Sequence, residues 1–239
     1  MKRFLPLFIV ALALSSCQED VRFNTPGFQG QKDDVFWRAN DARAYIDASG
    51  HLSIEALTEY ESLTLRTASA NPGTYILGTT NLNNSAVYTS NFNDIDLEYA
   101  IVAVPGPVGA ITFIVTPGSG YVSGNSVATT GGSGSGLTVN ILANASGAVT
   151  SIIPSSRGNG YVAGDIVTVA GGNLNCKFRV ENVQNSSGEI KITEYDTENF
   201  TVSGTFKFNA ANANDNPFGG PILNFQYGEF YQIPIFPSM

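Results

Sequence analysis

The feature that most constrains the fold is the alternation of apolar and polar residues in short segments along most of the chain. Segments 42–46, 52–57 and 62–65 alternate or nearly alternate, and turn residues separate them. A period of two places successive side chains on opposite faces of a strand, so these segments predict short antiparallel β-strands. The turn 47–50 predicts a hairpin between the first two. No long amphipathic helix is expected, and 54–60 is the one ambiguous stretch.

The same pattern recurs elsewhere along the chain. Further segments of this kind lie at 35–39, 74–77, 86–89, 188–195 and 200–208. The last two flank the turn 196–199 and predict a second hairpin. A final strand is expected around 225–233, ended by Pro234 and Pro237, because proline lacks the N–H that a sheet ladder needs. The sequence therefore predicts an all-β fold, an antiparallel β-sandwich or barrel-like host domain.

Composition excludes several classes of function. The 239 residues are 43% hydrophobic and 11% aromatic, which suffices to bury one or two cores. The net charge is −8, and no cluster of lysine and arginine follows residue 3, so nucleic-acid binding has no electrostatic basis. A single histidine and two cysteines leave little material for a zinc site or a Ser-His-Asp triad. No cofactor is expected.

The N-terminal residues have the composition of a signal peptide. Lys2 and Arg3 are followed by an apolar run over 4–14 and then by Leu14-Ser15-Ser16-Cys17. An apolar run of this length rises about 16 Å as a helix, well short of the roughly 30 Å hydrocarbon core of a bilayer. Residues 1–16 are therefore interpreted as a cleaved leader rather than as a membrane span.

The tetrad that ends at Cys17 resembles the bacterial lipobox. This resemblance implies that the sulfur of Cys17 is acylated, that the leader is removed and that the new amino terminus is acylated as well. The alternative is an incidental cysteine beside an ordinary cleavage site. Several acyl chains on one residue hold a protein to a membrane almost permanently, since each buried CH₂ contributes about 0.8 kcal/mol. The expected partner of this end of the chain is thus a membrane.

The residues after Cys17 bear on which side of the membrane the protein faces. Gln18-Glu19-Asp20 resembles the acidic export signal that sends Bacteroidota lipoproteins to the outer face of the outer membrane. It equally fits the hydrated start of a linker, so a cell-surface and a periplasm-facing location both stay open. Residues 17–33 lack a period of 2 or 3.6 and are interpreted as a lipidated flexible stalk. Removal of the leader leaves 10 basic and 20 acidic residues, a net charge of −10.

The middle of the chain, 104–183, is rich in glycine and repeats itself with an offset of 40 residues. Segment 117–132 aligns on 157–172 with eight of sixteen positions identical. The shared glycines allow positive φ and close chain approach. Two copies are fewer than a self-sufficient solenoid needs, so they are predicted to pair with each other. The resulting β-module would be inserted into a discontinuous host domain made of 34–103 and 184–239.

The repeats resemble the Gly-x-Gly-Tyr-x-x-Gly-Asp repeats of phage tail fibres and other extracellular fibrous β-proteins. The copy at 158–165 fits, and the first copy departs by carrying Asn125 where the second has Asp165. The resemblance implies an adhesive or spacer module without catalytic residues. Asn125 and Asp165 are candidate Ca²⁺ ligands, or they cap tight turns through bonds to the backbone. Tyr121 and Tyr161 are the candidate binding residues of the module.

The flanking segments resemble a second family. The sequences that carry the resemblance lie at 35–39, 72–78, 192–196 and 202–208. They look like the Bacteroidota lipoproteins of the family of unknown function 6252, over about 34–92 and 187–235. The glycine-rich middle departs from this resemblance as an insertion. The family implies a location and a β-fold but no activity.

Acidic residues provide the candidate catalytic groups. The closely spaced carboxylates are Glu59/Glu61, Asp94/Asp96/Glu98 and Glu194/Asp196. Two carboxylates at roughly 5 to 9.5 Å are the machinery of glycoside hydrolysis. On an acidic protein the ordinary alternative is a solvated strand face.

Three other side chains are candidates for chemistry. His51 follows a turn and is expected to be an exposed residue at a strand start rather than a base. Cys176 shares an apolar face with Phe178 and Val180, which favours a buried, inert thiol over a nucleophile. Trp37 follows Phe36 in a strand and is expected in the core, although a tryptophan or tyrosine ring could also stack on a sugar.

The sequence thus predicts an outer-membrane lipoprotein that acts as a non-catalytic binding, adhesion or structural module. Its expected partner is a surface glycan or an outer-membrane protein. The alternatives are an accessory subunit of an outer-membrane complex and a carboxylate-based hydrolase of surface glycans. Two facing carboxylates in a concave pocket, with a raised pKa, would favour the hydrolase. A flat or convex aromatic and polar surface would favour binding.

Overall fold

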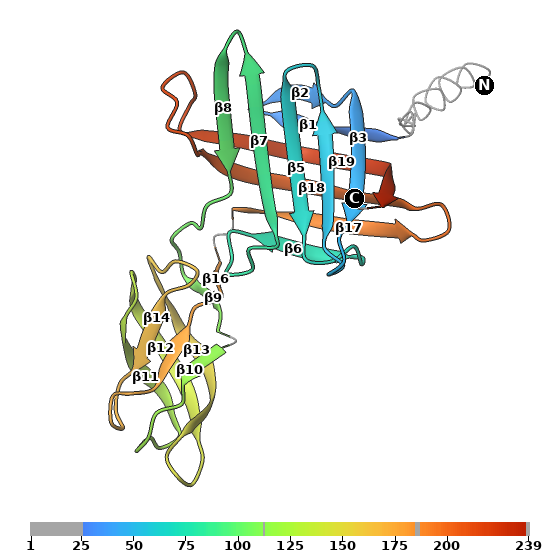
Figure 1. Ribbon diagram of the computed structural model, residues 1–239. Coiled ribbons are helices and arrows are strands. Elements are labelled where there is room, and N and C mark those ends of the chain that lie inside the picture. The colour runs from blue at the N-terminus through green and yellow to red at the C-terminus, as the bar shows by residue number, and fades with distance from the viewer. Residues whose placement is uncertain (1–25, 112, 185–186, 238–239) are drawn as a thin grey trace, which may run out of the picture.

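The computed structural model describes residues 26–111, 113–184 and 187–237, and all regular structure in these ranges is β (Figure 1). The chain therefore has the all-β, sandwich-like and barrel-like fold that the alternating pattern predicted. Within the described ranges no helix is long and apolar enough to cross a membrane. The leader, Cys17 and the first part of the expected stalk lie outside the described residues.

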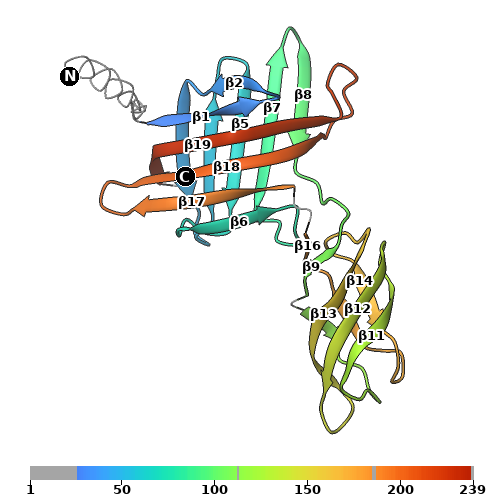
Figure 2. The same cartoon turned by 180° about the vertical axis from the view of Figure 1, so that it is seen from behind.

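Eleven strands form one large sheet, which folds over into two layers. The front layer contains β3 (Asp41–Ile46), β4 (Leu52–Leu57), β5 (Glu61–Thr67), β7 (Ser85–Phe92) and β8 (Ile95–Ala100). The back layer contains β2 (Val35–Arg38), β1 (Gly27–Lys32), β19 (Ile222–Pro237), β18 (Thr201–Asn212), β17 (Gly188–Asp196) and β6 (Gly73–Leu77). Figures 1 and 2 show the strands of the two layers crossing at a steep angle, which is the geometry of an orthogonal sandwich.

Strand pairing closes this sandwich at two corners. At one corner the end of β18 pairs with β8, where Ala211 lies opposite Ala100. At the other, β19 leaves β18 after Pro234 and continues as a parallel neighbour of β3, with Ile235 opposite Ala44. The prediction that Pro234 ends the last strand is wrong. Its missing N–H falls where the strand changes partners, a place at which proline is tolerated.

The core between the layers is aromatic. Phe225, fully buried, lies with its ring centroid 5.1 Å from that of Phe208 and 5.6 Å from that of Trp37. Phe28 packs on Phe206 at 5.0 Å. Large rings of this kind bury about 150–250 Å² each and dominate the energetics of a core.

The expected flexible stalk ends earlier than residue 33. Residues Gly27–Lys32 form β1, which pairs with both β2 and β19. The side chain of Phe28 is 2% exposed in the aromatic core. The segment is rich in glycine and glutamine and has no alternating pattern that would predict a strand. It is ordered by the burial of this ring and by backbone hydrogen bonds to two neighbouring strands.

Six of the remaining strands form a separate small sheet. Its order is β10 (Phe113–Thr116), β15 (Lys177–Arg179), β14 (Ile166–Val169), β11 (Gly124–Gly131), β12 (Ser135–Ala143) and β13 (Val149–Asn159). The short pair β9 (Val108–Ala110) and β16 (Asn182–Val183) links it to the large sheet. Its residues form their own hydrophobic cluster, from Val108 to Val183. Figures 1 and 2 show it to one side of the large sheet.

The two copies of the repeat pack on each other in a reciprocal way. A Cβ on Gly172 of the second copy would lie 2.6 Å from the ring of Tyr121 in the first. A Cβ on Gly132 of the first copy would lie 3.1 Å from the ring of Tyr161 in the second. Both glycines have positive φ, +49° and +73°. Each tyrosine is therefore seated on the Gly-Gly turn of the other copy, and only glycine leaves room for it.

Candidate functional site

The structure places both tyrosines of the repeats in the core of the small sheet. Tyr121 is 4% exposed and Tyr161 is 2% exposed. The Tyr121 hydroxyl donates to the carbonyl of Val169 and accepts from the amide of Cys176, both at 3.0 Å. The two rings are packing elements and present no open face to a ligand.

The acidic position of the repeat caps a turn. The carboxylate of Asp165 accepts hydrogen bonds from the amide of Val162 at 2.9 Å and from the amide and hydroxyl of Ser133 at 3.0 and 2.8 Å. Burial raises the pKa of Asp165, but these bonds outweigh it and the net shift is downward. Asn125 is exposed at the start of β11. Among the described residues no three His, Cys, Asp or Glu side chains are grouped so that they could hold a metal ion.

The three other candidates occupy ordinary structural positions. Trp37 is 6% exposed and meets the edge of Phe28 in the aromatic core. Cys176 is fully buried, and burial raises the pKa of its thiol. His51 is partly exposed at the start of β4, with its Nδ1 at 3.0 Å from Oδ2 of Asp47.

Two of the three sets of closely spaced acidic residues contribute side chains to one end of the front layer. They line a pocket of about 640 Å³, which we call the acidic groove. Its main polar lining is Glu59, Tyr60, Glu61, Asp96, Glu98 and Asn214. These residues come from the β4–β5 turn, from the start of β5, from β8 and from the loop between β18 and β19. Pairing of β5 with β7 and of β7 with β8 brings these segments side by side.

The other carboxylates considered in the sequence lie elsewhere. Asp94 sits in the β7–β8 turn with φ of +61° and does not line the groove. Asp196 caps the β17–β18 turn, where the side-chain amide of Asn199 donates to it at 2.7 Å. That bond and the backbone amides of the turn lower the pKa of Asp196.

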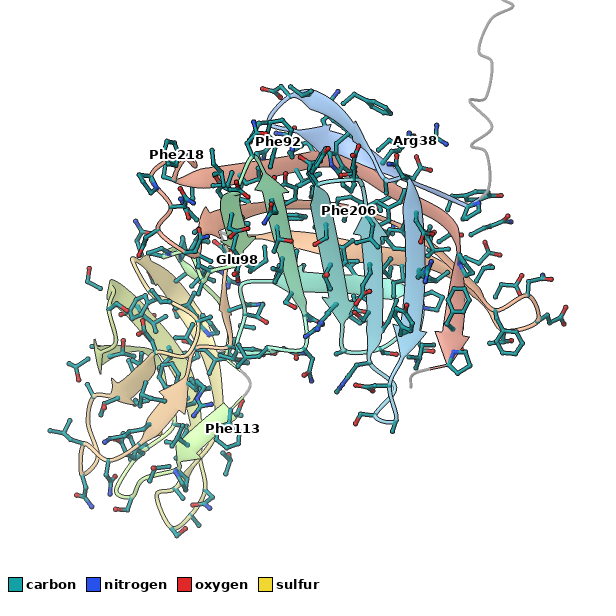
Figure 3. The ribbon with its side chains drawn as sticks, turned by 45° about the horizontal axis from the view of Figure 1, so that its top comes forward. Arg38, Phe92, Glu98, Phe113, Phe206 and Phe218 are labelled. Atoms are coloured by element: carbon teal, nitrogen blue, oxygen red, sulfur yellow. The ribbon has the colours of Figure 1, made fainter. Side chains whose placement is uncertain are left out.

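One wall of the acidic groove is a loop that the sequence analysis did not identify. The side-chain amides of Asn214 and Asn216 donate to the carbonyl of Asp96 at 2.9 and 2.7 Å. The Tyr99 hydroxyl donates to the carbonyl of Gly220 at 3.1 Å. These bonds fix the loop, which carries the exposed Phe218 (Figure 3), against β8. The asparagine-rich run at 209–216 could have indicated this ordered loop, since asparagine side chains commonly form hydrogen bonds to nearby backbone.

Tyr60 lines the groove, and the exposed ring of Phe92 packs against Tyr60 outside the lining. Tyr60 is 47% exposed and Phe92 is 53% exposed, and their rings meet edge to face at 5.2 Å. The Tyr60 hydroxyl donates to Oε1 of Glu59 at 2.7 Å. Figure 3 shows Phe92 at the tip of the β7–β8 hairpin, with Glu98 further along β8. Rings held in this way form a surface on which a sugar ring or a cation can pack.

Glu61 also forms a polar cluster that joins the two layers beneath the groove. Its carboxylate accepts hydrogen bonds from Nζ of Lys32 on β1, Nε1 of Trp37 on β2 and the hydroxyl of Tyr88 on β7. Nζ of Lys32 also lies 4.9 Å from the centroid of the Tyr88 ring. Because the partners come from both layers, the cluster fixes the position of the Glu61 side chain.

The ionisation of Glu61 follows from this environment. Partial burial raises its pKa, but the hydrogen bonds from Lys32, Tyr88 and Trp37 and the lysine charge outweigh burial, so the net shift is downward. Burial and the neighbouring Glu61 raise the pKa of the Tyr88 hydroxyl. Glu61 is therefore a carboxylate at neutral pH with both oxygens engaged, which suits a hydrogen-bond acceptor and not a general acid.

Comparison with known proteins identifies a family. A family model described as Domain of unknown function (DUF6252) matches residues 24–130 and 123–234. The two matches extend across the glycine-rich middle, whereas the resemblance read from the sequence covered only 34–92 and 187–235. No curated protein and no solved structure matches the chain.

Proposed function

This chain belongs to the DUF6252 family of domains of unknown function, and on that premise we propose that it is a lipid-anchored surface protein whose large sheet is a non-catalytic binding module. The acidic groove is its binding site, and a carbohydrate is its ligand. The observation that carries this proposal is the exposed ring pair Tyr60–Phe92, in which Tyr60 lines a groove together with carboxylates, amides and hydroxyls.

The chemistry of the groove fits a polyhydroxyl ligand. Glu59, Asp96 and Glu98 supply acceptors for sugar hydroxyls, and the side chain of Asn214 supplies an amide. The rings of Tyr60 and Phe92 supply apolar faces that pack on the C–H face of a pyranose. The loop wall and the Glu61 cluster are held by hydrogen bonds before any ligand arrives, so binding orders few groups.

A glycan hydrolase is the second candidate, because the groove does gather carboxylates from two of the three acidic pairs. Hydrolysis requires one carboxylic acid that keeps its proton near neutral pH. Glu61, the most buried of the acidic residues in the groove, has a lowered pKa. Both of its carboxylate oxygens already accept hydrogen bonds from neighbouring side chains. This favours binding over hydrolysis.

The proposal includes the membrane anchor. Cys17 carries the lipid, in the manner of Bacteroidota lipoproteins, and the acidic residues after it direct the protein to the cell surface. Support comes from the Leu-Ser-Ser-Cys tetrad and from the apolar run before it. Cys17→Ala should abolish palmitate incorporation and release the protein from membranes. Retention of Cys17→Ala in the membrane fraction would reject the anchor.

The proposal also gives the small sheet a role as an inserted spacer or adhesion module. The two chain crossings between the sheets run side by side, with Val108 opposite Val183 and the amide of Gln184 donating to the carbonyl of Pro107 at 2.7 Å. Adjacent entry and exit points are what an insertion into a loop tip requires, because they add little closure entropy to the host.

A glycan array probed with the full chain tests the binding site. The double variant Tyr60→Ala/Phe92→Ala should bind the best glycan at least tenfold more weakly than the unmodified protein, about 1.4 kcal/mol. Phe113→Ala removes a ring of similar exposure, 59%, from the small sheet and is the matched control (Figure 3). Equal binding by the two variants would reject the groove as the site, and release of shortened glycan would reject the non-catalytic assignment.

A further inference from the structure

A second pocket lies at the opposite end of the same front layer. Its volume is about 400 Å³, and its lining includes Tyr45, Asp47, His51, Ser53, Arg66 and Asn83. We call it the arginine pocket. The acidic groove starts at the first residues of β5, and Arg66 is near the last, so the two sites are separated by most of the length of that strand.

Strand register builds the floor of the arginine pocket. A row of cross-strand neighbours runs over β19, β3, β4 and β5. Its members, in that order, are Phe236, Tyr45, Ser53 and Arg66. The neighbouring row, which contains Ala44, Ile54 and Leu65, is buried in the core. Because side chains alternate between faces, the row that contains Arg66 projects from the outer face.

The pocket holds one guanidinium, Arg66, and one carboxylate, Asp47, and the two differ in how far they are engaged. Among the described residues no salt bridge involves its guanidinium. The nearby carboxylate of Asp47, in contrast, is already engaged by the amides of Ser49 and His51 at 2.8 and 2.9 Å and by the imidazole of His51. The exposed guanidinium on an acidic protein is thus available to an anion from solution.

The remaining lining suits a sugar ring. The rings of Tyr45 and Phe236 lie 6.3 Å apart and form an aromatic wall at one side of the row. Ser53 contributes a hydroxyl between that wall and Arg66, and Asn83 contributes an amide from the β6–β7 loop. An arginine donates two parallel hydrogen bonds to a carboxylate, and an aromatic ring packs on the face of a pyranose.

We propose that the arginine pocket binds a sugar that carries a carboxylate, that is, a uronic acid residue of a glycan. The carboxylate pairs with Arg66, the pyranose ring packs on Tyr45, and ring hydroxyls bond to Ser53 and Asn83. One guanidinium beside Asp47 matches a single negative charge better than the larger charge of a phosphate. This site is independent of the acidic groove, so either assignment can fail without the other.

Titration of the full chain with glucuronate, followed by ligand-observed NMR, tests the proposal. Glucuronate should bind at least tenfold more tightly than glucose, than acetate and than inorganic phosphate. Arg66→Gln should weaken glucuronate binding at least tenfold. Lys191→Gln, which removes an exposed cation from β17, is the matched control and should leave binding unchanged. Tyr60→Ala/Phe92→Ala should also leave it unchanged.

Three results would overturn the assignment. Equal affinity for acetate or phosphate would show a general anion site without recognition of a sugar. Equal affinity for glucose would show that the carboxylate is not recognised. Unchanged binding by Arg66→Gln would exclude the guanidinium. The methyl ester of glucuronate, which has no charge, tests the same interaction on the unmodified protein and should bind at least tenfold more weakly than the acid.

Discussion

The two sheets of this protein reach a packed core by opposite routes. The large sheet fills the space between its layers with bulky rings, including Phe28, Trp37, Phe206 and Phe225. The small sheet uses two tyrosines, each packed on a glycine turn, and one buried phenylalanine, Phe178, among valine, leucine and isoleucine side chains. The first route depends on side-chain volume and the second on the absence of side chains at particular glycines.

The difference also separates the chemistry of the two regions. The large sheet holds the partly buried charge cluster of Glu61 and both proposed ligand sites. The candidate residues of the small sheet, Tyr121, Tyr161 and Asp165, are engaged in packing or in turn caps. We infer that recognition belongs to the large sheet, while the small sheet supplies extension. The chain contains one tryptophan, Trp37, so its fluorescence reports the large sheet alone.

The largest effect is expected from Phe225→Ala. Removal of this ring leaves a cavity among Trp37, Tyr88, Phe206 and Phe208 and should lower the free energy of unfolding of the large sheet by about 4 kcal/mol. Chemical denaturation followed by Trp37 fluorescence measures it. A loss below about 1 kcal/mol would contradict the view that ring volume holds this region together.

Gly172→Ala should destabilise the small sheet by about 3 kcal/mol, from a strained φ and from overpacking against the Tyr121 ring. Gly171→Ala is the matched control, because its φ is also positive, +89°, but a Cβ there would meet nothing within 4 Å. The control should lose only about 1 kcal/mol. Circular dichroism should record both changes while the Trp37 transition stays in place. Equal losses of stability in the two variants would show that the packing of Tyr121 on Gly172 is unimportant.

Glu61→Gln should lower the stability of the large sheet by about 2 kcal/mol at neutral pH, since it leaves the Lys32 charge partly buried without its partner. The folded-state pKa of Glu61 lies below its unfolded value of about 4.3, so its contribution is present above that pH and is lost as pH falls through the folded pKa. Fluorescence-detected unfolding between pH 3 and 7 should therefore show a flatter pH dependence in the variant. Parallel curves for the two proteins would refute the cluster's role.

The smallest effect is expected from Tyr121→Phe, at about 1.5 kcal/mol in the small sheet. The substitution keeps the ring and removes the hydroxyl that bonds Val169 and Cys176, which leaves a buried amide without a partner. Tyr227→Phe, at a side chain that is 78% exposed, is the control and should have no effect on circular dichroism melts. An unchanged melt for both variants would show that the hydroxyl contributes nothing.

The sequence predicted what depends on local pattern. The strands around 52–57 and 188–195 and the turn at 47–50 follow from alternation and turn residues, and the structure has them at β4, β17 and the β3–β4 hairpin. The strand β1 was missed because its ordering comes from two partners distant in sequence, β2 and β19.

The candidate sites show the same limit. Spacing identified Glu59, Glu61, Asp96 and Glu98 as acidic pairs, but pairing through β7 is what brings them to one groove. The sequence did not identify Arg66 as a candidate binding residue, because the side chains that form the pocket around it lie on three other strands. The repeat tyrosines were interpreted as candidate ligand contacts, since nothing local shows that each ring is covered by the opposite copy.

We propose that the large sheet is a self-sufficient body from which the small sheet projects. The most direct test is Trp37 fluorescence during denaturation of a chain in which 104–183 is replaced by a short Gly/Ser bridge. A self-sufficient large sheet should show a single cooperative transition with a midpoint close to that of the intact protein. A broad, non-cooperative transition, or a tryptophan already exposed to water without denaturant, would contradict it.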